Sequence, residues 1–208
     1  MDVNLSTALI AGVFGLGGAL GGVLLSSVTG KWSHDRSLRA EDERRWQHDR
    51  RTVYAAYLSL VGRMLKEIDG VAGLLRYSET SEPISDEDEE LVRGGLLDYF
   101  EEWETAVQLA LGEIQLLASP RVADLADRVS GALMEITVPV ETRSTFVDYY
   151  PAWFQALDLS TVLRDAMRME LGLDPAGTDA FPARRDQEWP WLSDRPTRSS
   201  YLQNHPDQ

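Results

Sequence analysis

An uncharged apolar run of 24 residues, Leu5–Val28, leads at once into a block of basic side chains, and this pairing restricts the chain more than any other feature. A helix rises about 1.5 Å per residue, so the run is about 36 Å long and can cross a hydrocarbon core of about 30 Å. Six glycines between Gly12 and Gly22 weaken both the helix propensity and the hydrophobicity of the run, so insertion is favourable without being strong. The rival interpretation is a cleaved signal peptide, but that requires basic residues before the run, where only Met1–Asn4 stand. We therefore expect a retained transmembrane anchor in residues 1–30.

The charges on either side of the anchor predict its orientation. The short N-terminal flank has no basic side chain, whereas residues 31–50 contain Lys31, Arg36, Arg39, Arg44, Arg45 and Arg50. By the positive-inside rule the N-terminus lies outside and residues 31–208 lie in the cytoplasm. The expected location is the inner (plasma) membrane, crossed once. The lipid bilayer is then one partner, and the basic side chains near it can contact anionic headgroups.

Composition fits a cytoplasmic body. The chain has no cysteine, which excludes disulfides and thiolate metal sites. Its net charge of −14 argues against nucleic acid as a partner, since phosphate contacts need a basic surface. The acids are concentrated: residues 79–104 contain eleven acids and one base, Arg93.

Apolar residues recur at steps of three and four, the period of amphipathic helices. The first stripe is Tyr54, Leu58, Val61, Leu65, Ile68, Ala72 and Leu75. The second is Leu96, Phe100, Trp103, Val107, Ala110, Ile114 and Leu117. The third is Val122, Ala126, Val129, Leu133 and Ile136, and a fourth region, residues 143–171, buries Phe146, Trp153, Leu157 and Leu163. No stretch alternates with period two for long, so we expect an all-α bundle of about four helices.

Capping and breaking residues predict where these helices begin and end. Ser85 or Asp86 caps an acidic first turn, and Ser119 caps a helix that has proline at its first position. Residues 138–140 (Val-Pro-Val) form a further break, and Pro151 should kink or split the last helix. Gly172 supplies the stop.

The expected organisation has four parts. Residues 1–30 are the anchor, 31–51 a charged juxtamembrane helix, 52–172 the cytoplasmic bundle, and 173–208 an extended or disordered tail that holds five of the nine prolines. The sequence Trp32-Ser-His-Asp-Arg36 recurs as Trp46-Gln-His-Asp-Arg50 after two heptads. This spacing is compatible with a coiled-coil stalk, but two copies are thin evidence, and a charged juxtamembrane helix with chance similarity is the favoured interpretation.

Small residues line one side of the predicted anchor. They are Ala8, Ala11, Gly15, Gly18, Gly22 and Ser26, at steps of three or four. Small faces allow helices to approach closely in lipid, which predicts a homo-oligomer, whether or not it opens a pore. The alternatives are a general enrichment of small residues in anchors and a single contact with another partner.

The inventory of chemical groups argues against an enzyme. The histidines, His34, His48 and His205, all lie outside the predicted bundle, and the anchor glycines lack the Gly-Lys-Ser/Thr ending of a phosphate loop. Residues 86–90 lack the glycine and the spacing of a calcium loop. Three glutamates flank Trp103 without a Glu-x-x-His partner, which favours an exposed acidic face over a metal site. We expect no catalytic residue, no cofactor and no metal.

The tail holds one docking motif, Trp189-Pro190-Trp191, with arginines around it. Exposed tryptophans beside a polyproline-like turn suit a linear recognition motif. Folding back so that both rings cover the bundle is the alternative.

Three stretches carry a resemblance to a family. They are 49–58 (Asp-Arg-Arg-Thr-Val-Tyr-Ala-Ala-Tyr-Leu), 114–125 (Ile-Gln-Leu-Leu-Ala-Ser-Pro-Arg-Val-Ala-Asp-Leu) and 163–172 (Leu-Arg-Asp-Ala-Met-Arg-Met-Glu-Leu-Gly). With the apolar anchor before them, the chain resembles uncharacterised single-pass, membrane-anchored helical-bundle proteins of actinobacteria and their phages. The resemblance implies an anchored bundle; the group has no established activity, so no functional residue is transferred.

Two functions remain open at this point. The first is a membrane-tethered interaction or scaffold module that recruits an unidentified cytoplasmic protein. The alternative is a self-assembling membrane effector, pore-forming or not, that acts through the small-residue side of the anchor.

Overall fold

The computed structural model describes residues 45–175 and 198–203. The chain divides into two compact units, residues 1–48 and 49–208, and the description below concerns the second unit and the helix that leads into it. None of the described helices is long and apolar enough to cross a membrane. The predicted anchor and residues 31–44 lie outside the described residues.

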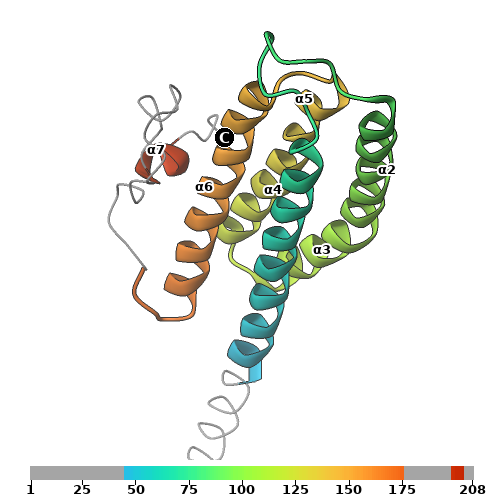
Figure 1. The fold of residues 1–208 in the computed structure, drawn as a ribbon. Coiled ribbons are helices and arrows are strands. Elements are labelled where there is room, and N and C mark those ends of the chain that lie inside the picture. Colours follow the sequence, from blue (N-terminus) through green and yellow to red (C-terminus); the bar gives the residue numbers. More distant parts are fainter. Residues whose placement is uncertain (1–44, 176–197, 204–208) are drawn as a thin grey trace, which may run out of the picture. The chain divides into compact units, whose positions relative to one another are not determined.

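Every regular element in the described ranges is helical (Figure 1). A helix over residues 45–72 is followed by α2 (Asp86–Glu102), the π-helical turn η1 (Trp103–Val107) and α3 (Gln108–Leu117), which form one continuous rod. The chain then turns back through α4 (Pro120–Glu135) and the short α5 (Thr137–Glu141), and returns through α6 (Phe146–Glu170). The expected all-α helical bundle is confirmed for this part of the chain.

Most members of the predicted apolar stripes form the core, but of the four side chains predicted in the fourth region only Leu163 is buried, while Phe146, Trp153 and Leu157 are partly buried and pack against it. In the first stripe every member except Leu58 is buried, and Leu58 packs against the core. All five members of the third stripe are buried. In the second stripe the structure buries Leu111 where the sequence predicted Ala110, because the π-helical turn changes the phase of the rod.

Helix ends follow the capping residues closely. Ser85 accepts a hydrogen bond from the backbone N–H of Asp88 and caps α2, and Ser119 accepts from Val122 and caps α4. At the end of α6, Gly172 has a φ of 72°, and the backbone N–H of Leu173 donates to the carbonyl of Arg168 over 2.8 Å. This is the closing bond of a Schellman motif, which requires a left-handed residue at the glycine position.

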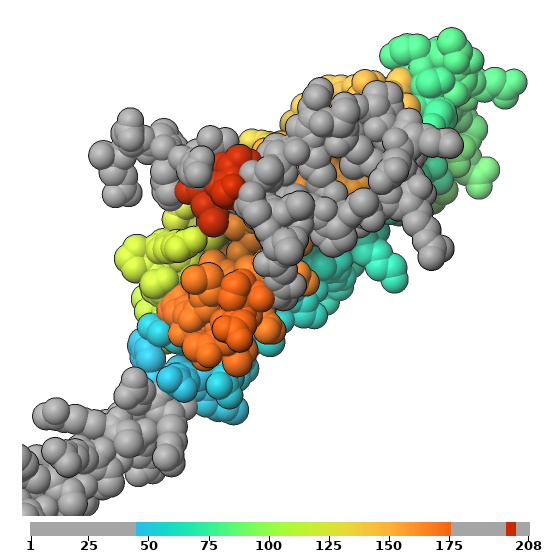
Figure 2. Space-filling view, turned by 90° about the vertical axis from the view of Figure 1, so that its left-hand side faces the viewer, coloured from blue at the N-terminus to red at the C-terminus, as the bar shows by residue number. Residues whose placement is uncertain are grey.

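Three sequence expectations are corrected. Pro151 does not split the last helix, since α6 is continuous from Phe146 to Glu170; the proline is its sixth residue, and the missing N–H removes a single backbone hydrogen bond of the helix. Pro139 lies inside α5, and the break falls instead at residues 142–145. The tail is not extended throughout, because residues 198–203 form α7, whose Tyr201 is buried in the core cluster. Figure 2 shows α7 in red beside α6 in orange.

Candidate functional site

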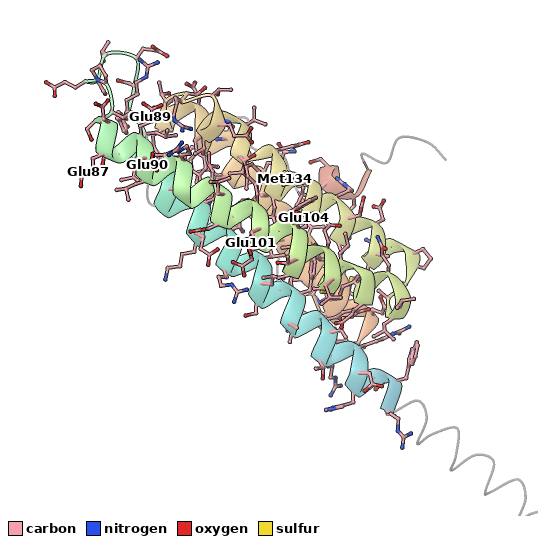
Figure 3. All side chains as sticks on the ribbon, turned by 90° about the vertical axis from the view of Figure 1, so that its right-hand side faces the viewer. Glu87, Glu89, Glu90, Glu101, Glu104 and Met134 are labelled. Carbon is pink, nitrogen blue, oxygen red and sulfur yellow. The ribbon has the colours of Figure 1, made fainter. Side chains whose placement is uncertain are left out.

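The outer side of the α2–η1–α3 rod exposes large apolar side chains among acids. Leu97, Leu109 and Leu116 are 65%, 69% and 82% exposed. Glu101, Glu104 and Glu113 are exposed between them. We call these six residues the leucine–acid face. Figure 3 views the rod from outside, with Glu101 and Glu104 labelled along it.

The three leucines share one side of the rod because of the π-helical turn. Leu109 follows Leu97 by twelve residues, and at about 100° per residue a plain α-helix would place them about 120° apart. The backbone N–H of Gln108 instead bonds to the carbonyl of Trp103, five residues back, so the turn absorbs one extra residue. The effective separation is then about eleven residues, or three full turns, which leaves the two side chains about 20° apart. Leu116 follows Leu109 by one heptad and continues the row.

Side-chain hydrogen bonds hold this turn in place. Trp103 donates its indole N–H to the carbonyl of Ser130 on α4 over 3.2 Å, and the Gln108 amide donates to the Ser130 hydroxyl over 3.2 Å. The Thr105 hydroxyl, on the exposed side of the turn, donates to the carbonyl of Glu101 one turn back over 2.6 Å. The π-helical turn is therefore supported both from the core and from the surface.

The α2–η1–α3 rod is strongly acidic. Residues 86–117 contain ten acids and one base, Arg93, which pairs with Glu90 one turn away. At the margin facing the helix over residues 45–72, Arg63 binds Glu102 and also approaches Glu67, 3.9 Å from Nε to Oε1. Burial, and then the neighbouring Glu102, raise the pKa of the Glu67 carboxyl.

The outer faces of the other helices differ. Large apolar side chains exposed on the rod are Leu91, Leu97, Leu109 and Leu116. Among the described residues α4 exposes none, and the helix over residues 45–72, α5 and α6 expose one each, Trp46, Val138 and Met169. Single exposed leucines are ordinary on soluble surfaces, but an aligned row indicates an interaction site. The leucine–acid face is thus the strongest candidate for a functional surface in the described bundle.

A polar cluster connects the helix over residues 45–72, the turn between α3 and α4, and the end of α6. Arg50 donates from Nε to the carbonyl of Leu117 over 2.7 Å and pairs through Nη1 with Glu170, 3.0 Å away. Glu170 also accepts from Ser119, from the backbone N–H over 3.0 Å and from the hydroxyl over 2.8 Å. Burial, and then the charge of Glu170, raise the pKa of the Tyr54 phenol, which stays neutral. Arg50, Ser119 and Glu170 all bind one another or the backbone within the bundle, so this cluster is a structural clamp.

The site residues predicted from the sequence fall largely elsewhere. The association face (Ala8, Ala11, Gly15, Gly18, Gly22, Ser26), four of the basic residues (Lys31, Arg36, Arg39, Arg44) and the docking motif (Trp189, Pro190, Trp191) lie outside the described residues. Arg45 is described and exposed. The exposed acidic face expected around Trp103 is present at Glu101 and Glu104, while Glu102 is bound to Arg63.

Sequence reasoning missed the leucines of the face and the Arg50 clamp. Leu97 and Leu109 did not belong to any single stripe, since the extra residue between them hides their common phase. No cluster of acids and histidines among the described residues is arranged to hold a metal ion. Comparison of the chain with protein-family models, curated proteins and solved structures finds no match.

Proposed function

We propose that this chain is a membrane-tethered interaction module without catalytic activity of its own. The anchor in residues 5–28 holds the bundle at the cytoplasmic side of the inner membrane, and the bundle recruits a cytoplasmic protein through the leucine–acid face. The observation that carries the proposal is the row of Leu97, Leu109 and Leu116 on the outer side of the rod. A bundle that served only as a spacer would have no need of aligned apolar side chains in water.

The docking part of the proposal is tested by photocrosslinking in the cells that produce the protein. A benzoylphenylalanine placed at Leu109 should give an adduct of one defined mass, and the same probe at Val138, which is also exposed on α5, should give none. Replacing residues 5–28 by an unrelated anchor should leave the adduct unchanged. Absence of an adduct at Leu109, or equal adducts at both positions, would contradict docking at this face.

The tethering part is tested by single-cysteine labelling, which suits this chain because it has no cysteine. A membrane-impermeant maleimide should label Asp2→Cys on intact cells and Glu82→Cys, in the exposed loop before α2, only after permeabilisation. The reverse pattern would overturn the proposed orientation.

The self-assembling effector remains the alternative, and the same cells distinguish it. Its activity depends on the small-residue side of the anchor, so Gly15→Leu with Gly22→Leu should abolish the phenotype while the protein still reaches the membrane. An interaction module should keep its adduct at position 109 in that double variant.

A further inference from the structure

The leucine row has the length and the spacing of a helix-binding surface. From Leu97 to Leu116 the rod extends about 28 Å, at about 1.5 Å per residue. The leucines are separated by about three turns and then by one heptad, once the extra residue in η1 is absorbed. A partner helix of about 20 residues with apolar side chains at heptad spacing can run along this row and bury each leucine.

The acids around the row restrict the charge of that helix. Glu101, Glu104 and Glu113 flank the leucines, and the one base of the rod, Arg93, is already paired with Glu90. An anionic helix or an anionic lipid surface would be repelled, and so would the same face of a second copy. Lysine or arginine beside the apolar positions could pair with the three carboxylates along the row.

We propose that the leucine–acid face binds a cationic amphipathic helix, in which apolar residues at heptad spacing cover the leucines and flanking Lys or Arg side chains pair with the glutamates. The proposal rests on the docking function above and names its partner by chemistry. Leucine burial supplies most of the affinity, and the exposed charges supply orientation and a faster encounter.

The test uses the full chain in neutral-detergent micelles and a labelled synthetic probe. The probe is a 21-residue helix with leucine at the two apolar heptad positions and lysine at the flanking positions, and its binding is followed by fluorescence anisotropy. The controls are a peptide of the same composition with its leucines scattered, a peptide with glutamate in place of lysine, and empty micelles. We expect binding by the first peptide alone, weakening as salt rises.

Matched variants separate the face from general charge attraction. Leu109→Gln with Leu116→Gln should weaken binding by at least about tenfold, and Glu101→Gln with Glu104→Gln by a smaller factor with a shallower salt dependence. Val138→Gln with Met169→Gln, and Asp127→Asn with Glu135→Gln, change exposed residues on other helices and should have no effect. Circular dichroism of each variant verifies that it is folded.

Each outcome has a distinct meaning. Equal binding by the scattered peptide, or unchanged binding by the folded leucine variant, would overturn the proposal. If the probe fails while the crosslink at position 109 persists, docking stands and the class of partner is wrong; if both fail, the docking function falls as well. Competition by a peptide of residues 31–51 would show that the basic segment of a second copy fits the same face.

Discussion

Arg50, on the helix over residues 45–72, and Glu170, the last residue of α6, form an ion pair of 3.0 Å that connects the two helices. Arg50 also satisfies a carbonyl at the C-terminal end of α3, and Glu170 accepts from the N-cap of α4. Each charge therefore opposes the partial charge of the helix end it contacts. The cluster fixes the helix over residues 45–72 against the turn between α3 and α4.

Breaking this pair should destabilise the bundle. Arg50→Gln leaves Glu170, whose side chain is only 12% exposed, without its cation, and hydrogen bonds to charged groups contribute about 1.5–3 kcal/mol. We expect a loss of about 2 kcal/mol, or roughly 4–8 °C in the thermal midpoint measured by circular dichroism of the full chain in neutral detergent. Arg51→Gln is the control, because Arg51 is exposed and should change stability little. Equal midpoints for the two variants would show that the pair contributes nothing.

Two adjacent glycines of α2 should respond in opposite directions to alanine. A Cβ at Gly95 would lie 2.5 Å from Cγ2 of Val71 on the neighbouring helix, and a β-branched side chain has little freedom to move away. Gly95→Ala should therefore cost about 1–3 kcal/mol. A Cβ at Gly94 would meet nothing within 4 Å, so Gly94→Ala should stabilise the protein by about 0.5–1 kcal/mol through helix propensity. Urea unfolding of both variants measures the difference, and a stabilising Gly95→Ala would contradict the close approach of these helices.

Local patterns were sufficient to predict the helices and their ends. The period of the stripe from Tyr54 to Ala72, and the caps at Ser85 and Ser119, depend only on near neighbours along the chain. The stop at Gly172 is local in the same way. Such features are encoded within one or two turns, which is why the sequence alone indicates them.

Features that depend on distant contacts were not predictable. Arg50 is one of six basic residues between positions 31 and 50. No local sequence feature shows that Arg50 is the one that donates to the carbonyl of Leu117, 67 residues away. The extra residue at η1 is stabilised by Ser130 on another helix, so a regular period extrapolated through Trp103 selected Ala110 in place of Leu111. The candidate site depends on that same turn, and it was missed for the same reason.

The Glu67 carboxyl should make the bundle less stable as the pH rises. Its pKa is raised above the ordinary value of 4.5, first by burial and then by Glu102, so the folded state holds the proton more tightly than the unfolded state. Stability is then highest with Glu67 protonated and falls as the pH rises from about 4.5 through the folded-state pKa. Glu67→Gln should remove this dependence and stabilise the protein at pH 7 by less than about 1 kcal/mol, since the pair is partly exposed.

A pH series of thermal midpoints tests this, with Glu104→Gln as the control on an exposed glutamate. The control should follow the parent chain at each pH. A lower midpoint for Glu67→Gln at pH 7 would mean that the contact between Arg63 and Glu67 outweighs the repulsion.

The short helix α7 should contribute to stability although it is remote in sequence from the bundle. Tyr201 is 7% exposed, and its carbonyl accepts a hydrogen bond from Nη1 of Arg128 on α4 over 2.7 Å. Tyr201→Ala should cost about 1–3 kcal/mol, less than the 3–5 kcal/mol typical of a large aromatic in a continuous core, because a six-residue helix can detach locally. Tyr77→Ala removes a tyrosine that is 57% exposed and should cost less than Tyr201→Ala. Chemical unfolding of both variants, together with a chain that ends at residue 175, tests this. If the truncated chain is as stable as the full one, residues 176–208 do not support the bundle. That result would favour the tail as a free docking segment.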